Sequence, residues 1–194
     1  FFCSTAAGEA DRIVVAYYPS WMRESMPVEE LPYKHLTHVA HAFAWPAADG
    51  SLEYDEGFFN AKMNKAIHAR GKKVLLALGG WGRDEQFEAL MKNADARKKF
   101  ISKLIETCRL YGYDGVDLDW EYPEEEDAGI FAEFVGNLRA ALDEAEIPLL
   151  TAAVPSRDFD NGFDMEKLAP HFNWIGGMPY DVHGTWRAHA GPNP

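Results

Sequence analysis

Residues Tyr113 to Pro123 read Y-D-G-V-D-L-D-W-E-Y-P, and this stretch decides the fold. Because side chains alternate faces along a strand, the carboxyls of Asp117, Asp119 and Glu121 share one face. The alternate positions, on the other face, are apolar: Val116, Leu118 and Trp120. Like charges about 7 Å apart repel one another and resist the loss of water, so a buried row of this kind implies a chemical role.

Three interpretations fit the acidic row. An exposed antiparallel strand would turn it to solvent, a cluster of oxygen ligands would hold a hard cation such as Mg²⁺ or Ca²⁺, and a buried strand would use it for catalysis. Gly112, Gly115 and the Tyr122-Pro123 stop bound a short strand, and helical patterns lie on both sides of it. That arrangement is typical of a buried parallel sheet, which favours the catalytic interpretation.

The rest of the chain repeats this alternation of strand and helix. Compact apolar runs predict further strands at 12–21, 36–44, 73–81, 148–155 and 173–180. Helical spacing of apolar residues predicts helices at 59–70, 84–91, 96–110, 130–142 and 165–169. Parallel neighbours in a sheet need such crossovers, so the predicted fold class is α/β, with a parallel sheet in one domain.

The four acids of this stretch also carry a family resemblance. The run from Asp114 to Glu121 resembles the D-x-x-D-x-D-x-E signature of glycoside hydrolase family 18, the chitinases and their relatives. The resemblance implies a TIM-type (β/α)8 barrel. A complete barrel typically needs about 250 residues, whereas the chain has 194. We therefore expect residues 11–194 to form a partial catalytic barrel of about six βα units, a fragment that lacks the last two strands.

Further motifs extend the resemblance over nearly the whole chain. The first predicted strand carries the family's Y-(Y/F)-x-x-W motif, the third a form of its S-x-G-G-W motif, and the sixth its M-x-Y-D motif. The resemblance assigns substrate binding to Tyr17, Trp21, Phe43, Gly80, Trp81, Met178 and Asp181. Ala77 replaces the usual serine of the third strand, which removes a hydroxyl from the acid cluster. Gly176, Gly177 and Pro179 are expected to weaken the sixth strand.

The resemblance also implies a substrate-assisted mechanism that retains configuration. Glu121, at the carboxyl end of its strand, would donate a proton to the glycosidic oxygen. The N-acetyl carbonyl of the bound sugar would attack its own anomeric carbon, while Asp119 accepts a hydrogen bond from the acetamido N–H. Asp117 would share a proton with Asp119. Tyr180 would donate to the acetamido carbonyl, and Asp114 would support the strand.

These implications predict hydrolysis of β-1,4-linked N-acetylglucosamine polymers, with no cofactor and no metal. Two alternatives share the fold: an endo-β-N-acetylglucosaminidase that cuts glycoprotein glycans, and a lectin-like chitin-binding relative with little or no activity. Such lectins commonly lack the glutamate that this chain has at position 121, which favours the enzyme. A metal-dependent barrel hydrolase is a further alternative.

Composition narrows the range of partners. The chain carries 31 acidic and 19 basic residues, and this formal charge of −12 argues against nucleic acid or an anionic membrane as a partner. Chitin or N-acetylglucosamine oligosaccharides, which are neutral, fit this charge. The full-length form is expected to be a monomer. The segment Phe1 to Ala7 is similar to the end of a secretory signal peptide, so residues 1–10 are expected to be its remnant or a disordered N-terminus, and the protein to be secreted.

Some residues allow a structural and a functional interpretation. The tryptophans fall near predicted strand ends or loops, where they pack internally or stack on sugar rings: Trp21, Trp45, Trp81, Trp120, Trp174 and Trp186. His38 and His41 have opposite parity on their strand, which favours core packing over a shared metal. Cys108 falls at helical spacing among apolar residues, so we expect a buried thiol.

Overall fold

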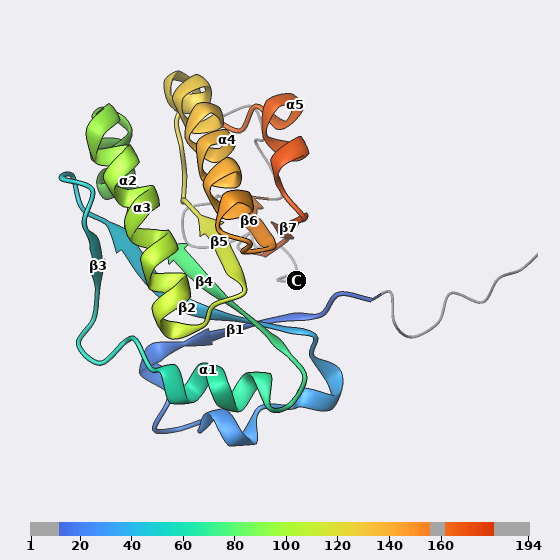
Figure 1. Ribbon diagram of the computed structural model, residues 1–194. Helices are drawn as coiled ribbons and strands as arrows, with labels where there is room; N and C mark the ends of the chain where they lie inside the picture. Colours follow the sequence, from blue (N-terminus) through green and yellow to red (C-terminus); the bar gives the residue numbers. More distant parts are fainter. Residues whose placement is uncertain (1–11, 156–161, 181–194) are drawn as a thin grey trace, which may run out of the picture.

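The computed structural model describes residues 12–155 and 162–180, and their strands form one curled sheet (Figure 1). The strands are β1 (Val15–Pro19), β2 (His38–Pro46), β3 (Leu52–Tyr54), β4 (Lys73–Gly79), β5 (Gly115–Asp119), β6 (Leu149–Pro155) and β7 (Trp174–Met178). Their order in the sheet is β1-β2-β4-β5-β6-β7, and every neighbouring pair on that path is parallel. This is the predicted architecture, an incomplete TIM-type barrel.

Helices occupy most of the crossovers between these parallel strands. They are α1 (Ala61–His68), α2 (Asp84–Met91), α3 (Ala94–Tyr111), α4 (Ala128–Glu144) and α5 (Met165–Leu168). The helices α3 and α4 lie side by side (Figure 1), and their buried Phe100 and Phe134 share one core with Val116 and Leu118 of β5. The predicted apolar face of the acidic strand is therefore confirmed. None of the helices in the described ranges is long and apolar enough to span a membrane.

The sheet curves so strongly that strands distant in its order meet across the concave side. The Tyr17 hydroxyl on β1 donates to Asp117 Oδ2 on β5 at 2.6 Å, although β2 and β4 lie between these strands. His38 of β2 meets Trp174 of β7 edge to face, with ring centroids 4.7 Å apart. The buried apolar side chains on this side are small, which leaves room for the acids.

The strand β3 is not predicted by the sequence pattern. It has 3 residues and pairs antiparallel with the end of β2, where Glu53 lies opposite Trp45. Three residues are too few to display an alternating pattern, although the Asp49-Gly50 turn before it is visible in the sequence. This short hairpin widens the sheet at the carboxyl end of β2, on the side where the candidate site lies.

The glycines of the last strand do not break it. β7 pairs with β6 through both Gly176 and Gly177, and Pro179 follows the last residue of β7, where no ladder hydrogen bond is required of it. The strand therefore delivers Met178 and Tyr180 to the carboxyl end of the sheet in spite of these substitutions.

Two buried polar residues have the predicted structural roles. His41 is fully buried, with Nδ1 2.7 Å from the Tyr113 hydroxyl and Nε2 2.8 Å from Arg23 Nη2. Its burial lowers its pKa to about 3, so the ring stays neutral in the core. Cys108 is also buried, and burial raises the pKa of its thiol to about 12.

Gly115 is required where β5 approaches β6. A Cβ added there would lie 2.1 Å from the Leu149 carbonyl oxygen, so Gly115→Ala must push the two strands apart. We expect a loss of about 1–3 kcal/mol in the free energy of unfolding, measured by chemical denaturation. Gly177→Ala on β7 is the matched control, because nothing lies within 4 Å of its added Cβ. Equal stability of the two variants would contradict the expected clash.

Candidate active site

The acidic row lies at the carboxyl end of β5. Asp117 and Asp119 are on the strand and are only 3% and 4% exposed, and Glu121 follows two residues after its end, half-buried. Trp120 lies between Asp119 and Glu121 in the sequence. Its ring stacks on Phe87 of α2 with centroids 5.3 Å apart and meets Phe131 of α4 edge to face at 5.2 Å. These contacts fix the backbone after the strand, so the carboxyls of Asp119 and Glu121 are held on the concave side.

Asp117 is held by hydroxyl groups from two other strands. Tyr17 on β1 donates to its Oδ2 at 2.6 Å, and Thr151 on β6 donates to its Oδ1. Burial raises the pKa of Asp117, against the opposing effect of these two hydrogen bonds. Burial and the adjacent Asp117 also raise the pKa of Tyr17, which keeps its phenol a neutral donor.

The effect expected from Ala77 is partly offset by Thr151. Ala77 lies opposite Asp117 in the register of β4 and β5 and offers no hydroxyl, while Thr151 on the other side of β5 does. Sequence reasoning did not identify Thr151. Its signal was a lone hydroxyl residue in the apolar run from Leu149 to Val154.

Asp119 lies between the other two acids of the row. Burial first, and then the charges of Glu121 and Asp117, raise the pKa of Asp119 to about 8. Its Oδ1 is buried and has no hydrogen-bond partner among the described residues. The raised pKa of Asp119 favours its protonated form, and its Oδ1 is available to a ligand. A proton shared between Asp117 and Asp119 stays a prediction.

The raised pKa of Asp119 predicts a pH-dependent gain in stability on substitution. Between about pH 4, where an unfolded aspartate titrates, and pH 8, the folded protein holds a proton that the unfolded chain releases, so stability falls as pH rises. Asp119→Asn removes this titration. We expect its free energy of unfolding to match the parent near pH 4 and to exceed it by on the order of a few kcal/mol at pH 8.

The measurement is chemical denaturation at several pH values, with exposed Glu56→Gln as the control. A difference between Asp119→Asn and the parent that stays constant with pH would show that Asp119 ionises normally in the folded protein.

Asp114 lies apart from the other acids, before β5 begins. Its carboxylate accepts hydrogen bonds from Lys73 Nζ at 2.8 Å, from the Val74 backbone N–H at 2.8 Å and from His68 Nε2 at 2.7 Å. Burial opposes ionisation, but these partners outweigh it and lower the pKa of Asp114. Asp114 thus ties the start of β5 to α1 and β4, consistent with the supporting role that was predicted for it.

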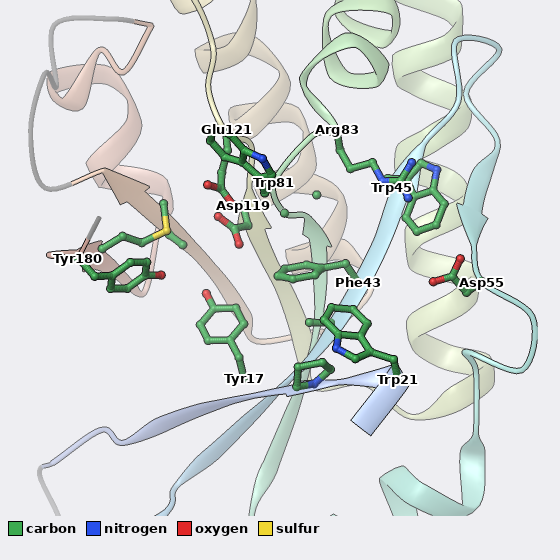
Figure 2. Close-up of a pocket in the computed structure, with 16 residues that line it drawn as sticks. Tyr17, Trp21, Phe43, Trp45, Asp55, Trp81, Arg83, Asp119, Glu121 and Tyr180 are labelled. Atoms are coloured by element: carbon green, nitrogen blue, oxygen red, sulfur yellow. The ribbon is translucent and has the colours of Figure 1, made fainter. Parts of the chain in front are cut away.

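A cleft of about 510 Å³ opens at this end of the sheet (Figure 2). Asp119 and Glu121 line it, together with these other predicted site residues: Tyr17, Trp21, Phe43, Gly80, Trp81, Met178 and Tyr180. Asp117 lies beneath the cleft, behind Tyr17. Asp181 lies outside the described residues. The structure therefore brings nearly all of the predicted site into one place.

The Gly79-Gly80 pair shapes the floor of the cleft. A Cβ on Gly79 would lie 2.1 Å from the Asp119 carbonyl oxygen, and one on Gly80 would lie 2.9 Å from the Phe43 ring. Both glycines have positive φ, and the Gly80 N–H donates to the Asp119 carbonyl at 2.8 Å. The pair therefore allows the end of β4 to lie against the end of β5, and it turns the chain so that Trp81, 81% exposed, stands beside the cleft.

The tryptophans divide between those that pack internally and those that are exposed beside the cleft. Trp21 and Trp81 expose 65% and 81% of their surface beside the cleft, as rings that stack on sugars would. Trp120 packs in the core, and Trp174 is half-buried against His38. Trp45 lines the cleft but is only 9% exposed. Trp186 lies outside the described residues.

Sequence reasoning did not identify several residues that line the cleft. They are Pro19, Ala42, Trp45, Asp55, Gly79, Arg83 and Ala153. Trp45, Asp55 and Arg83 gather at the end of the cleft away from Tyr180 (Figure 2). Only Trp45 had been noted, as a tryptophan near a strand end. No group of three or more side chains suited to a metal occurs within the described part of the chain.

The comparison with protein families gives one match that covers most of the chain. The model for "Glycosyl hydrolases family 18" matches residues 13–194. Among curated proteins, a chitinase-like effector of Moniliophthora roreri is 31% identical, over 98% of this chain and 50% of its own length. A probable endochitinase of Caenorhabditis elegans is 33% identical, over 91% of this chain and 33% of its own length.

Solved structures resemble the fold closely. The Group IV chitinase of Ostrinia furnacalis, in complex with allosamidin, matches with a TM-score of 0.81 and 28% identity, over 94% of this chain and 55% of that one. A family 18 chitinase of Cycas revoluta, in complex with (GlcNAc)3, matches with a TM-score of 0.84 and 27% identity, over 94% of this chain and 59% of that one. The chain thus spans about half the length of most of these relatives.

Proposed function

The chain belongs to the family 18 glycosyl hydrolases, and we propose that it forms part of the active site of an enzyme that hydrolyses chitin, the β-1,4-linked polymer of N-acetylglucosamine. One observation carries the proposal. Asp119 and Glu121 line a cleft that also holds the exposed rings of Trp21 and Trp81. Aromatic faces of this kind suit the apolar faces of sugar rings, and the acids supply the chemistry. The similar solved structures are complexes with carbohydrate ligands, allosamidin in one and (GlcNAc)3 in the other.

In the proposed mechanism, Glu121 is the general acid. It stands at the mouth of the cleft, beyond the end of β5, where a glycosidic oxygen lying across the cleft is within its reach. Proton transfer from Glu121 to that oxygen lets the leaving sugar depart as a neutral alcohol. The same residue, now ionised, then takes a proton from the water that completes hydrolysis.

Asp119 acts on the acetamido group of the sugar. Its buried Oδ1, which has no partner among the described residues, accepts a hydrogen bond from the acetamido N–H. That contact turns the acetamido carbonyl oxygen toward the anomeric carbon, where it forms a bond as the glycosidic bond breaks. The ring that results carries positive charge, and loss of the Asp119 proton stabilises it. Asp117, fixed by Tyr17 and Thr151, is the neighbour to which that proton can pass.

Tyr17 and Tyr180 face the same part of the cleft from its other side (Figure 2). In this proposal the Tyr180 hydroxyl donates to the acetamido carbonyl and aligns it for attack. Cleavage within the polymer chain stays a prediction. Secretion and a monomeric state stay predictions.

Product analysis tests the proposal. Chitin oligomers and N-glycopeptides are incubated with the protein, and the products are separated by mass. We expect shorter N-acetylglucosamine oligomers from the first substrate and no cleavage of the second. Cleavage of the glycopeptide core instead would identify an endo-β-N-acetylglucosaminidase, and oligomer binding without any cleavage would identify a lectin.

A further inference from the structure

The end of the cleft farthest from Tyr180 carries a fixed cation. The Arg83 guanidinium carbon lies 3.7 Å from the centroid of the Trp45 ring, and both residues line the cleft (Figure 2). Trp45 Nε1 in turn donates to Glu53 Oε2 at 3.0 Å. The antiparallel pairing of β2 and β3 places Glu53 opposite Trp45, so the hairpin holds the indole and the indole holds the guanidinium.

This stacking changes what each residue can do. Arg83 covers a face of the Trp45 indole, which is 9% exposed, so that face is closed to a sugar ring. The guanidinium is half-buried and makes no hydrogen bond or ion pair with another described residue. Its N–H donors are therefore held in one place and free to bind a ligand in the cleft.

Asp55 adds the complementary group at this end. It follows β3 directly, is exposed and lines the cleft. Its carboxylate only accepts hydrogen bonds, whereas the guanidinium of Arg83 only donates them. A sugar hydroxyl both donates and accepts, so the hydroxyl groups of a sugar ring complement both residues.

We propose that Arg83 and Asp55 bind a sugar ring at the β2–β3 end of the cleft, and that Trp45 is the positioning residue that holds Arg83. The proposal rests on the proposed function and deepens it. We expect a long oligomer seated at the acids to extend to this position and a short one to stop before it, so that the affinity gained with oligomer length depends on Arg83.

The test measures binding of the N-acetylglucosamine dimer and hexamer by titration calorimetry. The Glu121→Gln background prevents hydrolysis during the titration. We expect Arg83→Met to lower the ratio of hexamer affinity to dimer affinity roughly tenfold, as the loss of hydrogen bonds from a charged group does. Arg70→Met is the matched control, because the Arg70 guanidinium also lies over a ring, that of Tyr33 at 5.1 Å, but lines no part of the cleft.

Two further variants separate position from charge. Arg83→Lys keeps the charge and loses the planar donor group. We therefore expect it to show most of the decrease in the ratio of hexamer affinity to dimer affinity that Arg83→Met shows. Trp45→Phe should lower the ratio when Arg83 is present and have little further effect in the Arg83→Met protein, because it acts through Arg83. Circular dichroism is used to check that each variant folds. If Arg83→Met does not fold, Arg83→Lys is used to test the inference instead.

The outcomes are distinct. A lower ratio in the Arg83 variants with an unchanged ratio in Arg70→Met supports the inference. Equal ratios of hexamer affinity to dimer affinity in the parent and in all of the variants overturn the inference and leave the proposed function intact. Failure of the parent to bind either oligomer overturns the proposed function, and the inference with it.

Discussion

Glu121→Gln is expected to abolish most of the turnover of chitin oligomers and to leave their binding nearly intact. The amide has almost the size of the carboxyl but cannot supply a proton to the glycosidic oxygen. General acid catalysis typically contributes about 10²–10⁴-fold to the rate, so kcat should fall by about that factor, while the dissociation constant changes by less than about threefold. Steady-state kinetics on a fluorogenic N-acetylglucosamine oligomer give the first quantity and calorimetry gives the second.

Glu126→Gln is the control for this experiment. Glu126 is exposed in the 3-10 turn that precedes α4, and it does not line the cleft. Its kinetics should match those of the parent. Full activity in Glu121→Gln would place the proton donor elsewhere, whereas a loss of binding equal to the loss of rate would mean that Glu121 binds substrate in the ground state.

A larger effect is expected when the substrate loses its acetamido group. The substrate-assisted mechanism takes its nucleophile from that group, and intramolecular groups in good geometry act at effective concentrations of about 10⁵ M or more. A glucose oligomer of matched length and linkage should therefore show no hydrolysis above background, a fall of at least about 10⁵-fold. The measurement is product release from both oligomers under the same conditions.

The Asp119→Asn variant is the matched test on the protein side. It loses the acid that orients the acetamido group, so it should lower turnover of the N-acetylated oligomer and leave the glucose oligomer at background. Comparable hydrolysis of the two oligomers by the parent would show that the acetamido group is not the nucleophile, contrary to the role proposed for Asp119.

Much of the fold could be predicted because the decisive signals are local. The parity of Val116 and Leu118 against Asp117 and Asp119 fixes which face of β5 meets the helices, and the structure confirms it. The positions of the motif residues then follow, because the carboxyl ends of parallel strands meet at one edge of a barrel.

The features that sequence reasoning missed depend on long-range contacts. Thr151 of β6 reaches Asp117 on the neighbouring strand β5, and Arg83, just before α2, reaches Trp45 on β2, so neither pairing leaves a pattern in its own segment. The strand β3 depends on pairing with β2 rather than on its own residues. The tolerance of β7 for Gly176 and Gly177 has the same origin, since its ladder with β6 compensates for weak local propensity.

The anomeric configuration of the first product tests the central claim most directly. Proton NMR during cleavage of an N-acetylglucosamine oligomer by the protein follows the reducing end that hydrolysis creates. The proposed mechanism passes through two displacements at the anomeric carbon, so the β anomer should appear first and the α anomer only later, by mutarotation. An α anomer formed first would mean direct attack by water and would contradict the role given to Asp119.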